Sequence, residues 1–297
     1  MPRFLSCDWG TTHFRLRLVA GTRVLRQVAA PRGVASFANA SDRSTAFHRV
    51  LRSAIRRLRP PDNKTPVVIS GMAASSIGWH ELPYARLPFA LDGSNLVAHQ
   101  VEPGVTLLSG VRSDTDVLRG EETELIGLSR IHHLDRAMVI LPGTHSKHIS
   151  VDRGHMVSFQ TFLTGELFAV LSEHSVLRHS VRGPVSPHSL AFTAGVEAAT
   201  KLPVTAALFQ VRTRQLLQRA STGDGAAFLS GLLIGAEWQA IPPRHPVVLA
   251  ARAPVASLYE RAARLLGFNR RLTVIPPATV DKLATLGQAF WLQQQEY

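Results

Sequence analysis

Residues 3–29 read RFLSCDWGTTHFRLRLVAGTRVLRQVA and set the topology of the chain. Apolar and charged residues alternate along 14–19, and Gly10-Thr11 stands before this run. A period of two is typical of a strand, and a Gly-Thr pair between two such runs predicts a tight turn. The stretch therefore predicts a meander of three short strands, over residues 3–7, 14–19 and 23–29.

The same pattern returns in the middle of the chain. Residues 137–163 again read as three short strands, with Gly143-Thr144 in the first turn. A repeated unit of this kind indicates two related halves. Gly10-Thr11 and Gly143-Thr144 then occupy equivalent turns, so we expect each half to present one Gly-Thr loop and the two loops to face one another.

The other segments alternate between helical and strand patterns. A helix that Ser41 or Asp42 can cap is expected before Pro60, and later strands are expected at 247–250 and 272–275. This alternation predicts an α/β fold with parallel strands joined by helices. We place the two halves at 1–112 and 113–297, with the last helix free to pack on the first half. Helices of the second half are expected at 165–174, 191–200, 204–218, 224–239, 254–266 and 280–295.

Composition excludes several classes of protein. The 297 residues include 33 Lys+Arg and 21 Asp+Glu, a net charge of +12, but the arginines are scattered and form no run beside aromatic residues. Scatter of this kind indicates a basic surface without a nucleic-acid partner. Cys7 is the single cysteine, which excludes a disulfide framework and a thiolate metal site. The apolar run 228–236 is too short to span a membrane, so we expect no membrane partner and a cytoplasmic protein.

The first Gly-Thr turn has the residue types that a nucleotide needs. Asp8 can hold Mg²⁺ directly or through water, because this cation prefers oxygen ligands. Gly10 lets a phosphate approach the backbone, and the hydroxyls of Thr11 and Thr12 can donate to it. An Asp-x-Gly turn can equally be structural. The second copy at 143–144 favours a clamp on a nucleoside triphosphate.

Several longer strings resemble one family. They are DWGTT (8–12), GM (71–72), GW (78–79), RGEET (119–123), PGTHSK (142–147), TGEL (164–167) and FLSGLLIGAE (228–237). In this order they are similar to the 2-dehydro-3-deoxygalactonokinase family, within the superfamily of sugar kinases, actin and heat-shock ATPases. The resemblance covers almost the whole chain.

This resemblance implies both a fold and an activity. The fold is two ribonuclease-H-like domains of the actin-like ATPase type with a nucleotide cleft between them, the first on the sugar and phosphate side and the second on the nucleotide side. The activity is phosphorylation of the terminal C6 hydroxyl of 2-dehydro-3-deoxy-D-galactonate in galactonate catabolism, with ATP and Mg²⁺. The expected partners are thus ATP and a small sugar acid, and the apolar segment 224–239 is compatible with either core or a homo-oligomer interface.

Two considerations leave other activities open: one sequence difference from the superfamily pattern, and the fact that nucleases share this fold. Residues 251–254 read ARAP where the superfamily usually has a glycine-rich turn for adenosine. A non-catalytic sensor of a sugar acid or nucleotide, or a kinase for a different sugar acid, is therefore an alternative. A nuclease on the same fold would need clustered carboxylates around Asp8, and the first half offers none near the expected strand ends.

The acidic residues at the start of the second half are candidates for the catalytic base. A carboxylate must take the proton of the attacking hydroxyl. Glu121 stands where sugar kinases of the glycerol-kinase type have the Asp of a Gly-Asp pair, so the resemblance implies this role. Glu122 is the second candidate, although a carboxylate in the first turn of a helix can simply be favoured by the macrodipole.

Basic and small residues complete the candidate site. Arg15 either reaches the transferred phosphoryl group or is an exposed strand residue, and Lys147 either meets phosphate or is a surface charge on the hairpin. Arg119 and Arg86 are candidates for the substrate carboxylate, because arginine offers two parallel donors. The sugar side is expected to be lined by Gly71, Met72 and Ser75.

Two further motifs receive structural interpretations. Thr164 is expected to cap the following helix, and Glu166 to complement its dipole. His145 and His148 have a His-x-x-His spacing, but they lie on a turn entering a strand and no carboxylate cluster completes a zinc site.

Overall fold

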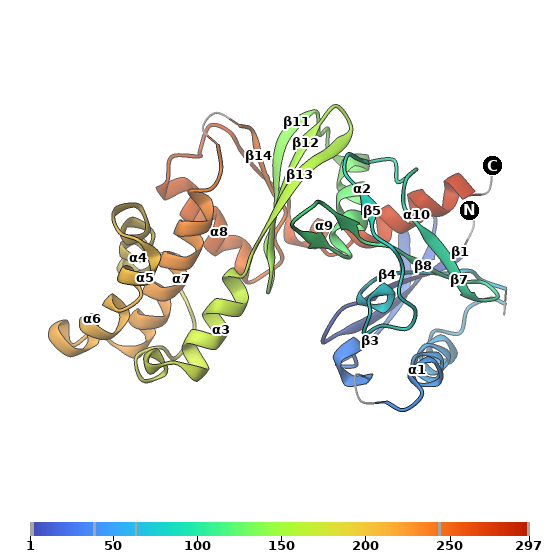
Figure 1. The fold of residues 1–297 in the computed structure, drawn as a ribbon, viewed down its shortest axis with the longest axis horizontal. Coiled ribbons are helices and arrows are strands. Elements are labelled where there is room, and N and C mark those ends of the chain that lie inside the picture. The colour runs from blue at the N-terminus through green and yellow to red at the C-terminus, as the bar shows by residue number, and fades with distance from the viewer. Residues whose placement is uncertain (1–2, 38–39, 63, 243–244, 296–297) are drawn as a thin grey trace. The chain divides into compact units, whose positions relative to one another are not determined.

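The computed structural model describes residues 3–37, 40–62, 64–242 and 245–295. The chain forms two compact units (Figure 1). The first comprises Met1–Asp135, Asp152–Ser158 and Asp281–Tyr297, and the second Arg136–Val151 and Phe159–Val280. This grouping puts residues 113–135 with the N-terminal half, whereas we expected a division after residue 112. It also puts the C-terminal helix there, a placement that our expectation had left open.

A six-stranded sheet forms the centre of the first unit, in the order β3-β2-β1-β4-β8-β7. The strands β1, β2 and β3 are antiparallel neighbours, which confirms the predicted meander, and β4 and β8 run parallel to β1. Asp8 lies beside Ser70 and Trp9 beside Gly71, so β1 and β4 end together. The bounds are β1 (Arg3–Trp9), β2 (Phe14–Ala20), β3 (Arg23–Ala30), β4 (Val67–Gly71), β7 (Ala98–Glu102) and β8 (Val105–Leu108).

Helices cover both faces of this sheet. Alternate residues of β1 point to opposite faces, so Leu5 packs in the same core as Phe47 of α1 (Arg43–Leu58), while Phe4 packs with Trp291 of α10 (Leu283–Gln295). Asp42 caps α1 by accepting a hydrogen bond of 3.0 Å from the N–H of Thr45, which confirms one of the two expected caps. The other elements are η1 (Val34–Phe37), η2 (Met72–Ala74), β5 (Ala85–Arg86), β6 (Phe89–Ala90), β9 (Val111–Arg112), β10 (Val117–Leu118) and α2 (Glu121–Ile131).

The second unit repeats the topology of the first. Its strands lie in the order β15-β14-β11-β12-β13, with β14 and β15 parallel to β11. In both units the first strand is central, with its hairpin on one side and two parallel strands on the other. This is the ribonuclease-H-like order, so the expected two-domain actin-like ATPase fold is confirmed. The bounds are β11 (Arg136–Leu141), β12 (Ser146–Asp152), β13 (His155–Phe162), β14 (Val247–Leu249) and β15 (Leu272–Val274).

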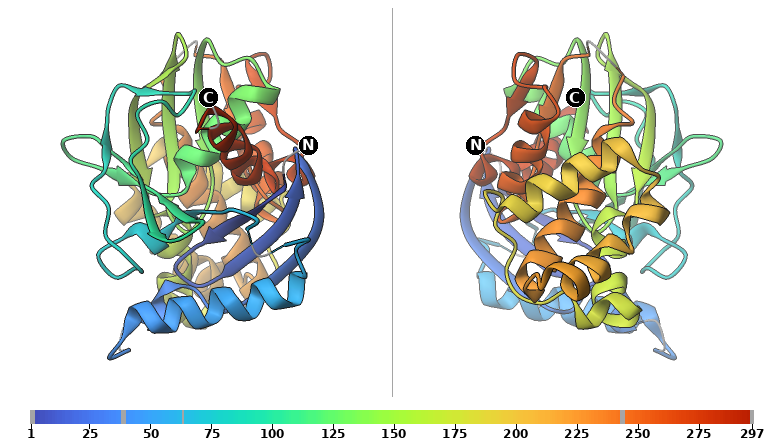
Figure 2. Two further views of the ribbon diagram at one scale, coloured as in Figure 1. Left: turned by 90° about the vertical axis from the view of Figure 1, so that its right-hand side faces the viewer. Right: turned by 90° about the vertical axis from the view of Figure 1, so that its left-hand side faces the viewer.

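Helices make up most of the second unit, and α4 and α7 lie side by side within it (Figure 2). A Cβ on Gly195 would lie 2.2 Å from the carbonyl oxygen of Phe228, and a Cβ on Gly231 would lie 2.2 Å from that of Phe192. The two backbones therefore touch, which explains the glycines of the string at 228–237 without a ligand. The bounds are α3 (Thr164–His174), η3 (Val176–His179), α4 (Leu190–Lys201), α5 (Val204–Ala207), α6 (Gln210–Gln218), α7 (Thr222–Trp238), α8 (Val255–Leu265) and α9 (Pro277–Val280).

The prediction of one helix over 204–218 is wrong, because α5 and α6 are separate. A tight turn in which the N–H of Val211 donates to the carbonyl oxygen of Leu208 lies between them.

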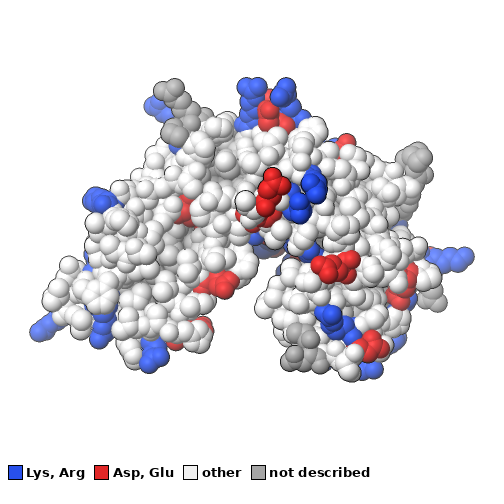
Figure 3. Space-filling model, viewed as in Figure 1, with Lys and Arg blue, Asp and Glu red and all other residues white. Residues whose placement is uncertain are grey.

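The charged side chains of the surface and the lengths of the helices can be compared with the composition. On the face shown in Figure 3, the Lys and Arg side chains of the described residues are spread over the surface rather than gathered in one patch. Among the helices of the described residues, none is long and apolar enough to cross a membrane.

The contact between α4 and α7 predicts a large difference between two glycines of α7. Gly231→Ala should lower the free energy of unfolding by about 1–3 kcal/mol, because the added methyl group overlaps a backbone carbonyl. Gly223→Ala should stay within about 1 kcal/mol of the parent, since the nearest atom to its Cβ is 3.7 Å away. Urea unfolding measures both variants, and equal stabilities would contradict the packing described.

Candidate functional site

The turn between β1 and β2 is held by the segment that follows β3. The carbonyl oxygens of Gly10, Thr11 and Thr12 each accept a hydrogen bond of 3.0 Å from the N–H groups of residues 33–35. A Cβ on Gly33 would lie 2.2 Å from the carbonyl oxygen of Thr11, so only glycine fits there. The carbonyl dipoles of the turn are thus directed into the protein, while the side chains of Thr11 and Thr12 are exposed.

The equivalent turn of the second unit is held in the same way. The N–H of Glu166 donates to the carbonyl oxygen of Thr144 at 3.0 Å, and a Cβ on Gly165 would lie 2.5 Å from that of Gly143. Gly143 and Thr144 are exposed. The segment after the third strand therefore supports the Gly-Thr turn in both units.

Neither Gly10 nor Gly143 is required by the packing of the chain. A Cβ would lie 3.6 Å from its nearest neighbour at Gly10 and 3.5 Å at Gly143, which is ordinary contact, and neither residue has a positive φ. Glycine at such positions lets a ligand approach the backbone closely. Both turns thus have room for an anion against the main chain.

Asp8 and Arg15 face each other across β1 and β2. The guanidinium Nη1 of Arg15 lies 3.7 Å from Oδ2 of Asp8, and the two side chains are 32% and 34% exposed. Asp8 therefore presents one accessible carboxylate at the end of its strand. The described residues contain no group of three or more metal-binding side chains. This single carboxylate fits Mg²⁺, which keeps several waters and takes other ligands from phosphate.

Lys147 is not a surface charge of the hairpin. It is 4% exposed on β12, and its Nζ lies 3.5 Å from the carbonyl oxygen of His145 in the turn. The alternative of an exposed lysine is therefore wrong, and contact with a ligand at the turn remains its candidate role.

Thr164 does not cap α3 as expected. The N-cap position is Leu163, which makes no side-chain hydrogen bond to the helix. The hydroxyl of Thr164 donates instead to the carboxylate of Glu237. His148 also contacts Glu237, whereas His145 contacts Glu166, so the two histidines have separate partners.

Gly71 brings the end of β4 against the start of α2. Gly71 has φ 95°, and a Cβ there would lie 2.8 Å from the carbonyl oxygen of Trp9. A Cβ on Gly120 would lie 3.4 Å from Cα of Gly71. The N-terminus of α2 therefore begins beside the ends of β1 and β4. In the turn after β4, the hydroxyl of Ser75 donates to the carbonyl oxygen of Met72 at 2.7 Å, so it already has an internal partner.

The two candidate bases have different environments. Glu121 is partly exposed, and its Oε2 accepts a hydrogen bond of 2.9 Å from the N–H of Arg119. Glu122 is fully buried, with Oε2 accepting from the N–H of Gly120 and Oε1 without a partner among the described residues. Burial, and then the charge of Glu121, raise the pKa of Glu122 to about 8. At neutral pH Glu122 thus keeps its own proton, which favours Glu121 as the group that can accept one.

Arg119 has a buried donor without a partner. Its Nη1 makes no hydrogen bond within the described residues, and its guanidinium lies 4.3 Å from the ring centre of Tyr84. Arg86 is exposed on β5, opposite Arg112 in register. A buried guanidinium nitrogen without a partner is costly, so Arg119 fits an anionic ligand better than Arg86 does.

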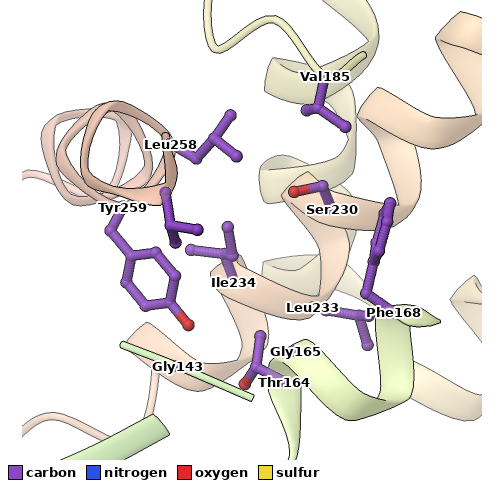
Figure 4. A pocket seen from close by; sticks show the side chains of 11 residues that line it. Gly143, Thr164, Gly165, Phe168, Val185, Ser230, Leu233, Ile234, Leu258 and Tyr259 are labelled. Carbon is purple, nitrogen blue, oxygen red and sulfur yellow. The ribbon is translucent and has the colours of Figure 1, made fainter. Parts of the chain in front are cut away.

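A cavity of about 190 Å³ lies beside the second turn, within the second unit (Figure 4). Apolar side chains from α3, α7 and α8 surround it, and Gly143, Thr164 and the Tyr259 side chain give it a polar edge. Its volume is below the ~300 Å³ of a site for a whole drug-sized ligand, so it suits a planar ring better than an entire nucleotide. The lining residues are Gly143, Thr164, Gly165, Phe168, Val185, Ser230, Leu233, Ile234, Val255, Leu258 and Tyr259.

Sequence reasoning missed the supporting role of Gly33 and Gly165 and, apart from Gly143, did not select the residues of the cavity as nucleotide-binding. Gly33 and Gly165 each follow the third strand of a meander, so extending the repeat by a few residues could have found both. The cavity carries no such signal, because its apolar side chains have the spacing of ordinary helix cores. Residues 251–254, which read ARAP where the superfamily usually has a glycine-rich turn, directly precede α8. Val255, Leu258 and Tyr259 of this helix line the cavity.

The buried Glu122 predicts a pH-dependent stability. Its pKa in the folded state, about 8, lies above its ordinary value of 4.5, so the unfolded chain releases a proton that the folded chain retains. This carboxyl should therefore favour folding fully below pH 4.5 and progressively less as pH rises to about 8. Relative to the parent, Glu122→Gln should gain up to about 1.4 kcal/mol per pH unit across this window.

Urea unfolding at several pH values measures this difference. The exposed Glu81→Gln is the matched control, and its profile should follow the parent. A Glu122→Gln profile parallel to the parent would mean that the carboxyl is not held neutral.

Comparison with known proteins identifies the family of the chain. The model of the 2-keto-3-deoxy-galactonokinase family matches residues 8–286. The chain is 32% identical over 304 residues to "Probable 2-dehydro-3-deoxygalactonokinase DgoK1" of Rhizobium meliloti (strain 1021), covering 97% of each chain. It is 31% identical over 274 residues to the 2-dehydro-3-deoxygalactonokinase of Escherichia coli (strain K12), covering 89% of this chain and 90% of that one.

A solved structure extends the comparison to three dimensions. It is the crystal structure titled "putative 2-dehydro-3-deoxygalactonokinase protein" from Sinorhizobium meliloti, with a TM-score of 0.86 at 30% identity, covering 98% of this chain and 96% of that one. Sequence and fold thus agree over nearly the whole length: the chain belongs to the 2-keto-3-deoxy-galactonokinase family.

Proposed function

We propose that this protein is a kinase that transfers the γ-phosphoryl group of ATP to the terminal hydroxyl of 2-dehydro-3-deoxy-D-galactonate. The observation that carries the proposal is the repeated exposed Gly-Thr turn, in which glycine has no packing role and the carbonyl oxygens are directed into the protein. Such a turn binds phosphate by backbone approach and hydroxyl donors. The sugar acid is the one in the names of the relatives. The need for ATP favours the cytoplasm as its compartment.

The second unit is proposed to hold the nucleotide. The adenine ring would occupy the cavity between α3, α7 and α8, and Gly143 both lines this cavity and belongs to the turn. The phosphates would then lie at Gly143 and Thr144, with Lys147 as their cation. Hydrophobic walls with a few polar groups at the edge are typical of sites for planar ligands.

The first unit is proposed to hold the reacting groups. The oxygen of the substrate hydroxyl attacks the γ-phosphorus, the bond from that phosphorus to the β–γ bridging oxygen breaks, and Glu121 takes the hydroxyl proton. Glu121 suits this role because its carboxylate is accessible at the helix start, whereas Glu122 is buried with its proton. ADP leaves with the bridging oxygen.

Asp8 and Arg15 are proposed to act on the phosphates. Asp8 would hold Mg²⁺, which neutralises charge on the phosphate oxygens when bound. Arg15, 3.7 Å from Asp8, would contact the transferred group. The hydroxyls of Thr11 and Thr12 and the backbone at Gly10 would complete the binding of the γ-phosphate.

Arg119 is proposed to bind the carboxylate of the sugar acid. Its partnerless Nη1 supports this, and the N–H of the same residue holds Glu121, so one residue links substrate binding to the base. Gly71, Met72 and Ser75 would line the sugar beside it, with Ser75 acting through its bulk because its hydroxyl is already bonded. Arg86 is the second candidate for the carboxylate.

The role of Glu121 predicts a loss of turnover without a loss of binding. Glu121→Gln should lower kcat by about 10²–10⁴-fold, because general base catalysis contributes on this scale. The dissociation constants for ATP and the sugar acid should change by no more than about 2-fold. ADP release with both substrates and Mg²⁺ measures the first quantity, and calorimetric titration measures the second.

Glu124→Gln is the control, since it removes the same charge from the same turn of α2. It should retain turnover. Normal turnover in Glu121→Gln would exclude Glu121 as the base. Binding of both ligands by the parent without release of ADP would identify a sensor instead of a kinase.

The environments of Arg119 and Arg86 predict unequal effects on substrate binding. Arg119→Met should raise KM for the sugar acid by about 10–100-fold, the worth of hydrogen bonds to a charged group, and leave KM for ATP within about 2-fold. Arg86→Met should change neither constant by more than about 3-fold. Initial-rate kinetics distinguish them, and the reverse ranking would transfer the carboxylate site to Arg86.

A further inference from the structure

Glu237, near the end of α7, is a buried carboxylate surrounded by hydrogen-bond donors. Its side chain is 1% exposed. Oε1 accepts from the hydroxyl of Ser146 at 2.5 Å and lies 2.8 Å from Nε2 of His148, while Oε2 accepts from the hydroxyls of Thr164 and Tyr259 at 2.5 and 2.6 Å. Four side chains therefore converge on one carboxylate.

The four partners come from three different elements. Ser146 and His148 lie at the start of β12, Thr164 at the start of α3 and Tyr259 on α8. Burial raises the pKa of Tyr259 well above its ordinary value, so its hydroxyl stays a donor. The carboxylate therefore joins β12, α3 and α8 to α7 within the second unit.

Two of these elements bear directly on the second Gly-Thr turn. Ser146 is the residue at which the turn enters β12, two positions after Thr144. Thr164 is followed by Gly165, whose backbone lies against the carbonyl oxygen of Gly143. The next residue, Glu166, donates its N–H to the carbonyl oxygen of Thr144. Glu237 thus binds both the end of the turn and the segment that supports it.

The same network reaches the cavity. Thr164 and Tyr259 line it, and both direct their hydroxyls to Oε2 of Glu237. Glu237 does not line the cavity itself, and neither does Ser146, which is fully buried. Glu237 therefore connects the turn to the cavity through hydrogen bonds, although its own side chain does not line the cavity.

We propose that Glu237 is a positioning residue that fixes the Gly143-Thr144 turn and the start of α3 in the geometry that binds nucleotide. This rests on the proposed function, in which the turn holds phosphate and the cavity the base. A carboxylate can accept from the three hydroxyls and from an Nε2–H of His148 at once, whereas an amide has one accepting oxygen and brings two N–H groups into the same space. The network would then rearrange, and the turn with it.

The test compares nucleotide binding with sugar-acid binding. Glu237→Gln should raise KM and the dissociation constant for ATP by about 10-fold or more, while KM for the sugar acid stays within about 2-fold. A merely structural role would lower stability without separating the two substrates. Initial-rate kinetics, calorimetric titration with ATP and a circular dichroism melt measure these quantities.

Ser146→Ala gives an independent arm of the same test. Ser146 has no exposed surface with which to touch ATP, so a weaker affinity for ATP can arise only through the network. The effects of Ser146→Ala and Glu237→Gln should be strongly non-additive in the double variant. If Glu237→Gln does not fold, the affinity of Ser146→Ala for ATP decides the proposal.

Ser180→Ala is the matched control. Ser180 is a fully buried serine of the same unit, and its hydroxyl donates to Gln215 at 2.7 Å, outside the network of Glu237. It should lower Tm without changing the affinity for ATP. Affinity within 2-fold of the parent in Ser146→Ala and in any folded Glu237→Gln would overturn the proposal. A parent that releases no ADP would instead overturn the proposed function.

Discussion

The contact between each Gly-Thr turn and the segment after the third strand is the interaction on which the site depends. Gly33 in the first unit and Gly165 in the second touch the turn so closely that a methyl group would overlap its carbonyl oxygens. Backbone N–H groups donate to the carbonyl oxygens of Gly10, Thr11 and Thr12 in the first turn and to that of Thr144 in the second. What remains exposed is the side of the turn with hydroxyls and a glycine backbone, which suits an anion.

Two buried carboxyl groups of the chain differ in their hydrogen-bond partners. Glu237 accepts hydrogen bonds from the hydroxyls of Ser146, Thr164 and Tyr259 and lies 2.8 Å from Nε2 of His148. Glu122 receives one N–H and lies beside the charge of Glu121, so its pKa rises and it holds a proton at neutral pH. Glu237 therefore links the elements around it as an acceptor, and the neutral Glu122 leaves the partly exposed Glu121 as the proposed base.

The charge of the whole chain is consistent with this division of roles. The net charge is +12, and the arginines behind it are scattered along the chain. Arg119 is the arginine whose surroundings best fit an anionic ligand, because its Nη1 is buried and has no hydrogen-bond partner among the described residues. Small anions held by individual cations explain such residues better than a continuous basic surface does.

Much of the fold follows from the sequence, because strand alternation and the Gly-Thr turns are local signals. The repeat of residues 3–29 at 137–163 predicted two related units, and the structure has the same strand order in both. Helix ends were less predictable: Thr164 has the residue type of a cap, but its hydroxyl donates to the buried carboxylate of Glu237 instead. Glu237 itself could not be found from spacing, since its partners lie 22 to 91 positions away.

The central claim, that the Gly-Thr turns bind the phosphates of ATP, is tested most directly by calorimetric titration of ATP into Gly143→Ala. The added methyl group has room in the chain, with its nearest neighbour 3.5 Å away, so the variant should melt at the temperature of the parent. The account predicts that its affinity for ATP falls by about 10-fold or more, because the methyl group occupies the space of a phosphate oxygen. Unchanged affinity in a folded Gly143→Ala would contradict it.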